Sequence, residues 1–318
     1  MAASEKRRAS GRRVNALGVH SLDSVVYAAP DLKLAETFHK SFGLGVRHEN
    51  AGLALYAEAS GHRWVSVVEG PKKRLHHLSF GLFEEDLAPF AKRMRRLGVE
   101  RIDSPRGFES NGIWLKDHDG TPVEVKVAEK VSPSRKPAAK LDPQPAGAGA
   151  APRRSLSGHT RPQRLSHTLL FSSSVPAAIN FYTRVLGLRV SDRSADDIVF
   201  LHAPHGSDHH VVAFCRSGGP GLHHTSWAVR SVHEIGLGAE RMREAGYDKG
   251  WGLGRHVLGS NYFHYVRDPW GSYSEYSFDI DFIPADVTWR SGDYGPEDSF
   301  YVWGPQPPSD FVVNYELA

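Results

Sequence analysis

The chain is almost without cysteine. Its 318 residues include only Cys215, which excludes an intrachain disulfide framework and is typical of proteins that fold in a reducing cytoplasm. The chain also lacks any apolar run of the roughly 18 to 20 residues that would span a bilayer. Its basic first 16 residues are not followed by the hydrophobic stretch of a secretory signal. We therefore expect a cytoplasmic protein that makes no membrane contact.

Excess basic charge is missing from most of the chain, although the formal net charge is +3. Residues 1–16 carry +4 and residues 131–163 carry +5, which leaves the remainder at −6. Because a nucleic-acid partner requires a basic face on the folded body, we expect no nucleic-acid partner.

Composition divides the chain into five parts. Residues 131–163 are dense in Pro, Ala and Gly and poor in large apolar residues, which is typical of a flexible linker. We therefore predict a disordered basic tail over 1–16, a first domain over 17–130, the linker over 131–163, a second domain over 164–285 and an aromatic and Pro-rich tail over 286–318. The last segment could cover a pocket or simply pack on the body.

Both domains repeat one short pattern. A strand is followed by an amphipathic helix, a glycine stop and about three short strands, and this order occurs four times. The strand and helix pairs are Ser21–Ala28 with Asp31–Phe42, Leu75–Leu82 with Glu84–Leu97, Leu165–Phe171 with Val175–Leu186, and Leu222–Val229 with Val232–Ala245. The pattern predicts an α+β fold of four βαβββ modules, with the two halves as duplicates.

The stretch from His256 to Glu275 predicts a β-hairpin. Asn261–Arg267 and Ser272–Asp279 have strand character, and Asp268-Pro269-Trp270-Gly271 has the residues of a type I turn. Glu275 then sits in an apolar strand. Either it is an edge residue that faces water or it pairs with a cation or metal, because an unpaired buried carboxylate is very costly.

Two histidines on other strands give Glu275 candidate partners. His167 lies in the first strand of the third module and His224 in the first strand of the fourth. Two imidazoles and one carboxylate that converge on one metal form the facial triad of non-haem Fe(II) oxygen chemistry. Singly, each histidine is more often a surface or hydrogen-bonded residue than a ligand.

Three motifs around these residues resemble the two-domain type I extradiol ring-cleaving dioxygenases of the vicinal oxygen chelate superfamily. They are Leu165-Ser166-His167, the run Leu222 to Trp227, and the run Tyr265 to Glu275 with its Asp-Pro-x-Gly turn. The resemblance covers about residues 17–285. It implies two tandem glyoxalase-like domains, a non-catalytic first domain, and His167, His224 and Glu275 as ligands of Fe(II).

The resemblance also implies further site residues by their spacing. His209 corresponds to a histidine on the oxygen side, while His256 and Tyr265 correspond to groups that hydrogen-bond the substrate. Leu258 and Gly259 are expected to line the ring pocket. A slip of one residue in the strand would exchange His209 for His210 and His224 for His223. In the first domain, Asp23 stands at the position of His167, so we expect that domain to have lost its site.

The activity implied by the resemblance is Fe(II)-dependent extradiol cleavage of a catechol by O2, in aromatic compound catabolism. The product would be a hydroxymuconic semialdehyde, and the enzyme is expected to be a homo-oligomer. The catechol, the cleavage position relative to its substituents and the choice between Fe(II) and Mn(II) remain open. The alternatives are a glyoxalase-like metal isomerase on the same fold and, less favoured, a drug-sequestering binding protein without metal ligands.

Overall fold

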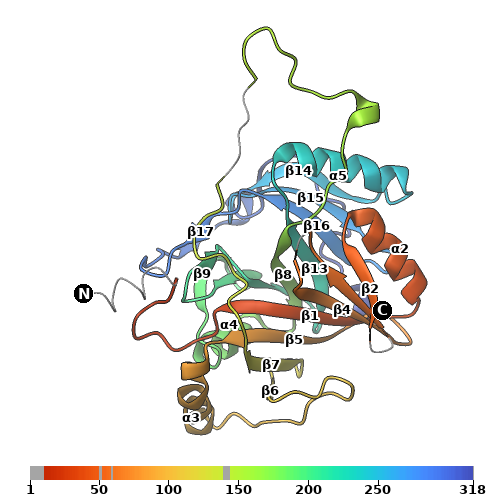
Figure 1. Cartoon of the computed structure of the whole chain (residues 1–318). Helices are drawn as coiled ribbons and strands as arrows, with labels where there is room; N and C mark the ends of the chain where they lie inside the picture. Colours follow the sequence, from red (N-terminus) through yellow and green to blue (C-terminus); the bar gives the residue numbers. More distant parts are fainter. Residues whose placement is uncertain (1–10, 50–51, 59, 139–143, 318) are drawn as a thin grey trace.

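Two large β-sheets form the body of the protein. The computed structural model describes residues 11–49, 52–58, 60–138 and 144–317. In these residues a seven-stranded sheet is built from strands between Ser21 and Val127, and a ten-stranded sheet from strands between Arg164 and Trp303 (Figure 1). The mixed α+β class predicted from the repeats is confirmed.

The first sheet contains the first two modules. Its strand order is β2-β3-β4-β1-β5-β7-β6, so the first strands of the two modules, β1 and β5, lie side by side at its centre. In the second module only β6 and β7 follow the helix among the described residues, and Arg101 forms an isolated bridge to Leu115. The elements are β1 (Ser21–Ala29), α2 (Leu32–Phe42), β2 (Gly45–Glu49), β3 (Gly52–Tyr56), β4 (Arg63–Glu69), β5 (Arg74–Leu82), η1 (Glu84–Asp86), α3 (Leu87–Leu97), β6 (Ile113–Lys116) and β7 (Pro122–Val127).

The second sheet contains the last two modules and two strands of the C-terminal segment. Its order is β18-β9-β10-β12-β8-β13-β16-β15-β14-β19. The third module comprises β8 (Arg164–Ser172), α4 (Val175–Arg184), β9 (Arg189–Ser194), β10 (Ile198–His202) and β12 (Val212–Arg216). The fourth comprises β13 (Gly221–Ala228), α5 (Val232–Glu244), β14 (Gly250–His256), β15 (Tyr262–Arg267) and β16 (Tyr273–Phe278). The remaining short elements are β11 (Ser207–Asp208), β17 (Phe282–Ile283), β18 (Gly292–Asp293), β19 (Tyr301–Trp303), η2 (Arg154–Leu156), η3 (Pro296–Asp298) and η4 (Tyr315–Leu317).

Local sequence explains the ends of the helices. The Asp31 carboxylate accepts a hydrogen bond from the Leu34 amide at 2.8 Å, which satisfies one of the free donors at the start of α2. Gly43 ends the same helix with φ +98°, a conformation that side-chain-bearing residues rarely adopt. Ser174 and Ser231 cap α4 and α5 in the same way as Asp31 caps α2.

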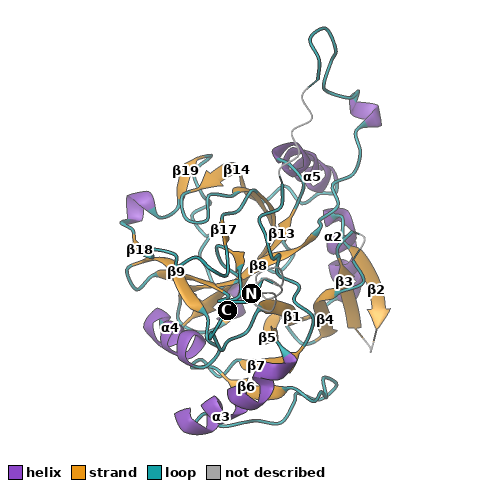
Figure 2. Ribbon diagram, turned by 60° about the vertical axis from the view of Figure 1, so that its left-hand side comes forward, coloured by secondary structure: helices purple, strands orange, loops and turns teal. Residues whose placement is uncertain are grey.

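The two halves share one hydrophobic core. Helix α2 of the first module lies beside α5 of the fourth (Figure 2). At the end of α2, the Phe42 ring stacks on Tyr276 of β16 with ring centres 3.9 Å apart. The Tyr276 hydroxyl donates to the Phe42 carbonyl at 2.8 Å. Aromatic contacts of this kind add to the burial of apolar area. The first half therefore supports strand β16 of the second, which carries Glu275.

The expected tails and linker are partly placed. Residues 1–10 of the predicted disordered tail and 139–143 of the predicted linker lie outside the described residues. Arg12 pairs with Asp86 at 2.7 Å, and Arg13 donates to the Val287 carbonyl at 2.8 Å. The linker leaves the body as an extended loop around residue 150 (Figure 1) and returns at Thr160, which is buried and donates to the Glu234 carbonyl. No helix in the described residues is long and apolar enough to cross a membrane.

Many histidines are buried in this fold. Desolvation lowers the pKa of a group of seven of them to about 3 or about 4, because charging an imidazole away from water is costly. The seven are His20, His39, His77, His202, His205, His223 and His264. The fold therefore holds these rings neutral at physiological pH.

Candidate metal centre

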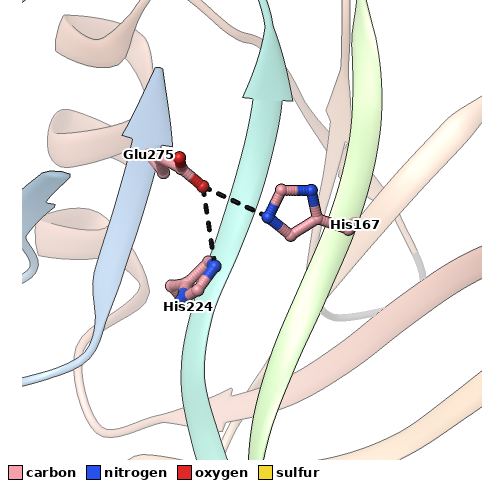
Figure 3. Close-up of side chains that lie close together, drawn as sticks. All are labelled: His167, His224 and Glu275. Atoms are coloured by element: carbon pink, nitrogen blue, oxygen red, sulfur yellow. Dashed lines mark ion pairs between the residues drawn. The ribbon is translucent and has the colours of Figure 1, made fainter. Parts of the chain in front are cut away.

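Three side chains from adjacent strands meet inside the second sheet. Glu275 Oε2 lies 3.3 Å from His167 Nε2 and 3.5 Å from His224 Nε2. The ligand atoms of the three residues all lie within 4.8 Å of one another. The side chains project from β8, β13 and β16 toward a common point (Figure 3). The structure thus brings together the three predicted ligands.

The predicted hairpin sets the position of Glu275. Strands β15 and β16 pair in antiparallel register with Tyr265 opposite Glu275. The turn between them is closed by the Gly271 amide, which donates to the Asp268 carbonyl at 3.3 Å. Because opposite residues of a pair share one face of a sheet, Tyr265 and Glu275 point into the same space. Glu275 is fully buried, so it does not face water as an edge residue.

Unpaired atoms at this point fit a bound cation. Glu275 Oε2 and His224 Nε2 are both buried and have no hydrogen-bond partner among the described residues. A buried carboxylate oxygen without a donor is costly, and a divalent cation between the two imidazole nitrogens and this oxygen would satisfy all of them. The donor set of two imidazoles and one carboxylate is the one that non-haem Fe(II) uses.

Each ligand is oriented by a second group. The His167 ring contacts the Ser166 hydroxyl at 3.3 Å, and Ser166 donates to Asp208 at 2.7 Å. The two Nδ1 atoms of His223 and His224 lie 2.7 Å apart, and His223 Nε2 donates to the Phe311 carbonyl at 2.8 Å. Such partners fix the ring tautomer so that the other nitrogen is free for the metal.

Asn261 orients the carboxylate. Its amide nitrogen donates to Glu275 Oε1 at 3.0 Å and to the Ser277 hydroxyl at 3.0 Å. Asn261 precedes β15 and lies two and four residues before Phe263 and Tyr265, which share one face of that strand. Sequence reasoning missed Asn261, although this alternation pointed to it.

A cavity of about 260 Å³ opens beside two of the ligands, His167 and His224. This volume lies slightly below the usual range of small-molecule pockets, so the cavity suits a small ligand. Its walls are mostly apolar or aromatic. The lining residues are His167, Leu169, Ser194, Asp197, Ile198, Phe200, His210, Cys215, His223, His224, His256, Leu258, Asn261, Tyr265, Pro296, Ser299, Phe300, Phe311 and Val312.

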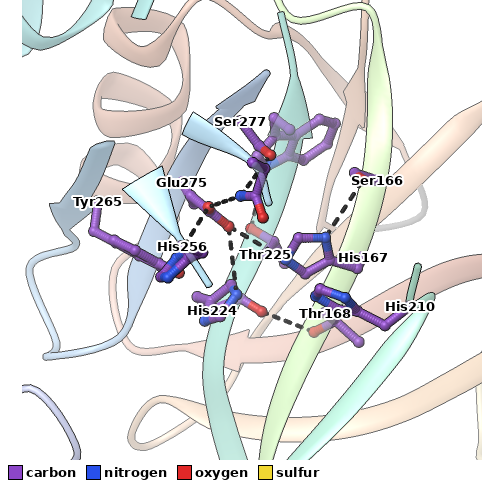
Figure 4. A network of polar contacts seen from close by, with 12 residues as sticks. Ser166, His167, Thr168, His210, His224, Thr225, His256, Tyr265, Glu275 and Ser277 are labelled. Carbon is purple, nitrogen blue, oxygen red and sulfur yellow. Dashed lines mark hydrogen bonds and ion pairs between the residues drawn. The ribbon is translucent and has the colours of Figure 1, made fainter. Parts of the chain in front are cut away.

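His256 and Tyr265, for which the resemblance implied contacts with a substrate, lie together on the cavity wall. The Tyr265 hydroxyl is 2.9 Å from His256 Nε2 (Figure 4). His256 Nδ1 donates to the Phe300 carbonyl at 2.8 Å. Burial lowers the pKa of His256, with an opposing effect from Glu275. Burial, reinforced by Glu275, raises the pKa of Tyr265 well above its usual value. The pair is therefore neutral, with a hydroxyl and an imidazole available to a ligand.

The expected position of His209 has to be corrected. His210, not His209, lines the cavity, and its ring centre is 4.0 Å from that of His167 (Figure 4). Burial, together with the neighbouring histidines, lowers the pKa of His210 well below its usual value. His209 is fully buried behind it, with Nε2 2.7 Å from Asp192 Oδ2.

The reason for the exchange is the irregular chain before β12. The His209 amide donates to the Asp281 carbonyl at 2.6 Å and the Val211 amide donates to the Leu201 carbonyl at 2.9 Å. His209 and His210 lie between β11 and β12, outside both strands, so strand alternation does not decide which of the two rings faces the cavity. The local sequence left both histidines open, and the spacing argument chose the wrong one for the cavity.

Of the two residues expected to line the ring pocket, only Leu258 does so. Gly259 adopts φ +87°, and its carbonyl accepts from the Asp281 amide at 2.8 Å. It therefore shapes the tight turn behind the cavity wall.

The first half has Asp23, His77 and Glu124 at the positions equivalent to the three ligands. Among the described residues these three do not form such a centre. Lys126 Nζ lies 2.8 Å from Asp23 and 3.7 Å from Glu124, so an ammonium group stands between these carboxylates. His77 Nδ1 is 2.7 Å from His76 Nδ1. The carboxylates of the first half are thus paired with an internal cation, and the loss of a site there stays a prediction.

The C-terminal segment forms part of the cavity wall. Phe300, Phe311 and Val312 line it, and β19 extends the sheet by pairing with β14. The sequence left open whether this segment covers a pocket or packs on the body, and its individual contacts could not be derived because it has no periodic pattern.

Comparison with known proteins agrees with this geometry. The model of the Glyoxalase/Bleomycin resistance protein/Dioxygenase superfamily matches residues 164–276, the part that carries all three ligands. The chain is 49% identical over 298 residues to Metapyrocatechase 2 of Cupriavidus necator, which covers 94% of this chain and 93% of that protein.

Solved structures share the fold at low identity. Homoprotocatechuate 2,3-dioxygenase of Brevibacterium fuscum superposes with a TM-score of 0.74 and 18% identity, covering 94% of this chain and 82% of that one. The Mn(II)-bound glyoxalase of Novosphingobium aromaticivorans superposes with a TM-score of 0.71 and 23% identity, covering 92% of this chain and 93% of that one. The fold alone therefore does not separate the two chemistries. The close relative does, and the chain belongs to the extradiol catechol dioxygenase family, within the vicinal oxygen chelate fold.

Proposed function

We propose that this protein is an Fe(II)-dependent enzyme that cleaves a catechol beside its two hydroxyls with O2, giving a hydroxymuconic semialdehyde. The observation that carries the proposal is the buried, unpaired Glu275 oxygen that faces His167 and His224 at 3.3 and 3.5 Å. An ion held there by His167, His224 and Glu275 would supply a redox-active centre with open positions for the diol and O2.

The chain's own residues would handle protons and orientation. His256 and Tyr265, 2.9 Å apart, would hydrogen-bond one oxygen of the diol and hold the ring in place. His210, on the opposite side of the ligands beside Phe200, would exchange a proton with the reacting oxygens. An imidazole is suited to this role because small environmental changes move its proton affinity across the neutral range. Phe300 and Phe311 would exclude water from the cavity.

The cavity supports a neutral catechol as the substrate. The described residues that line it include no lysine or arginine, and the acidic residue among them, Asp197, is already paired with Arg216 at 2.6 Å. A carboxylate on the substrate would find no cation to offset its loss of hydration. The apolar wall formed by Leu169, Ile198 and Leu258 favours hydrogen, alkyl or halogen substituents.

We also infer a cytoplasmic homo-oligomer. The single cysteine, Cys215, supports a reducing compartment. The C-terminal segment also carries exposed apolar side chains, namely Val302, Trp303, Val312, Val313, Tyr315 and Leu317. Exposed apolar surface favours a subunit contact.

The test is oxygen consumption. Protein loaded anaerobically with Fe(II) is mixed with air-saturated buffer and either catechol, 3-methylcatechol or a hemithioacetal. The proposal expects uptake of one O2 per catechol and a new visible absorbance from the ring-opened product. Conversion of the hemithioacetal without oxygen uptake would instead establish a glyoxalase-type isomerase.

A further inference from the structure

A hydrogen-bonded chain runs from Asp192 through His209 to His210. Asp192 Oδ2 is 2.7 Å from His209 Nε2, and His209 Nδ1 is 3.0 Å from His210 Nδ1. Asp192 and His209 are both buried, with 3% and 0% of their surface exposed. The other carboxylate oxygen, Oδ1, accepts from the Gly292 amide at 2.6 Å. Both oxygens of Asp192 therefore have fixed partners.

The hydrogen bonds in this series have a defined direction from donor to acceptor. An ionised carboxylate only accepts hydrogen bonds, so His209 must carry its proton on Nε2. With His209 neutral, its Nδ1 accepts and His210 donates to it from Nδ1, whereas a protonated His209 would donate from Nδ1 and give His210 the opposite tautomer. Nε2 of His210 is left as a lone pair, and it has no hydrogen-bond partner among the described residues. His210 lines the cavity, so this lone pair is available there.

The neighbouring histidine pair has the same construction. His223 donates from Nε2 to a backbone carbonyl at 2.8 Å, and its Nδ1 lies 2.7 Å from that of His224. His224 is thereby left with a bare Nε2, which a metal ligand requires. Each buried pair thus uses its outer ring to set the tautomer of its inner ring.

We propose that Asp192 and His209 are positioning residues that hold His210 in the tautomer whose Nε2 accepts a hydrogen bond from a diol hydroxyl in the cavity. The catalytic meaning rests on the proposed function, but the tautomer is a property of the chain alone. Trp289, whose ring centre lies 5.5 Å from that of His209, packs against His209 and keeps the imidazole ring in place.

The substitution Asp192→Asn should reverse the direction of the hydrogen bonds between residues 192, 209 and 210. The side-chain oxygen of asparagine must face the Gly292 amide, which can only donate, so the NH2 group must face His209. His209 Nε2 then becomes an acceptor, its proton moves to Nδ1, and His210 receives a hydrogen bond on Nδ1. His210 would consequently carry its proton on Nε2 and present a donor to the cavity.

The test is the tautomer of His210 in the full-length, metal-free chain. Long-range ¹H–¹⁵N correlation spectra of protein labelled with ¹⁵N-histidine distinguish a protonated Nδ1 from a protonated Nε2, and a His210→Gln variant assigns the signal. We expect protonated Nδ1 in the wild type and protonated Nε2 in Asp192→Asn. Asp293→Asn is the matched control, because Asp293 lies on the same paired strands but contacts Arg193 at 2.8 Å instead of His209; its spectrum should match the wild type.

Turnover gives a second, independent result. Iron-loaded Asp192→Asn should retain full iron content, while kcat falls about 10²-fold or more, the usual size of a lost acid–base contribution. A wild-type His210 protonated on Nε2 would overturn the proposal even if Asp192→Asn failed to fold. An unchanged tautomer in that variant would also overturn it. The predicted tautomers in a protein that cleaves no catechol would refute the proposed function instead.

Discussion

Asn261 provides a sharp test of how the centre is built. It is buried, with 1% of its surface exposed, and it donates to Glu275 Oε1 at 3.0 Å. The substitution Asn261→Leu keeps a similar volume but removes this donor. The carboxylate then loses a partner that restrains it in the orientation where Oε2 faces the two histidines.

The size of the effect follows from the charge on the acceptor. A hydrogen bond to an ionised group contributes about 1.5 to 3 kcal/mol, which corresponds to roughly 10- to 100-fold in a dissociation constant. Loss of an outer-shell partner of a metal ligand typically costs the same factor. We therefore expect the Fe(II) dissociation constant of Asn261→Leu to rise about 10- to 100-fold.

The assay is anaerobic competition between the protein and a chromogenic chelator for Fe(II). Asn180→Leu is the control, since Asn180 lies exposed on α4 and its side-chain oxygen accepts a hydrogen bond from the exposed Arg184 at 3.3 Å. An Asn261→Leu protein that folds normally and binds Fe(II) within twofold of the wild type would refute the argument that this amide holds the ligand.

Three other predictions test the site and the fold. Replacing His210 with Ala should preserve iron content and slow turnover about 10²-fold, and stopped-flow kinetics showing wild-type turnover would remove its proposed role. A catechol with a carboxymethyl substituent should have a kcat/KM at least about 10-fold below that of 3-methylcatechol, because its charge would be unpaired; equal values would contradict the neutral cavity. The free energy of unfolding of the metal-free protein should fall as pH drops below about 6.5. Below that pH each of the seven neutral histidines takes up a proton in the unfolded chain but not in the folded one. This lowers the free energy of unfolding by up to about 1.4 kcal/mol per residue at pH 5.5. The loss continues with falling pH down to the pKa of these histidines in the folded protein, about 3 to 4. Urea unfolding at pH 7.5, 6.5 and 5.5 measures this, and a stability independent of pH would show that the rings are not held neutral.

The sequence predicted the modules well because their signals are local. A capping Asp or Ser, an apolar helix face and a glycine stop each act within one turn. The Asp268 to Gly271 turn likewise fixes the β15–β16 register without help from distant residues. This register places Glu275 opposite Tyr265, but it left open whether Glu275 faced water or a metal. The resemblance of the three motifs was what implied His167, His224 and Glu275 as ligands.

Features that depend on distant contacts could not be predicted. The choice between His209 and His210 is made by the bond from the His209 amide to Asp281 and by the contact of the ring with Asp192. Neither partner is marked by any pattern in the sequence. Phe311 is held at the cavity by a hydrogen bond from His223 to its carbonyl. No sequence periodicity or motif spacing predicts this contact.

The central claim is that one ferrous ion is held by two imidazoles and one carboxylate. The most direct measurement is a crystal structure of the protein loaded anaerobically with one equivalent of Fe(II). We predict a single iron at metal-ligand distance, about 2.0 to 2.2 Å, from His167 Nε2, His224 Nε2 and a Glu275 oxygen, with its remaining positions open to the cavity. Iron bound elsewhere, or a fourth protein ligand that closes the site, would contradict the account.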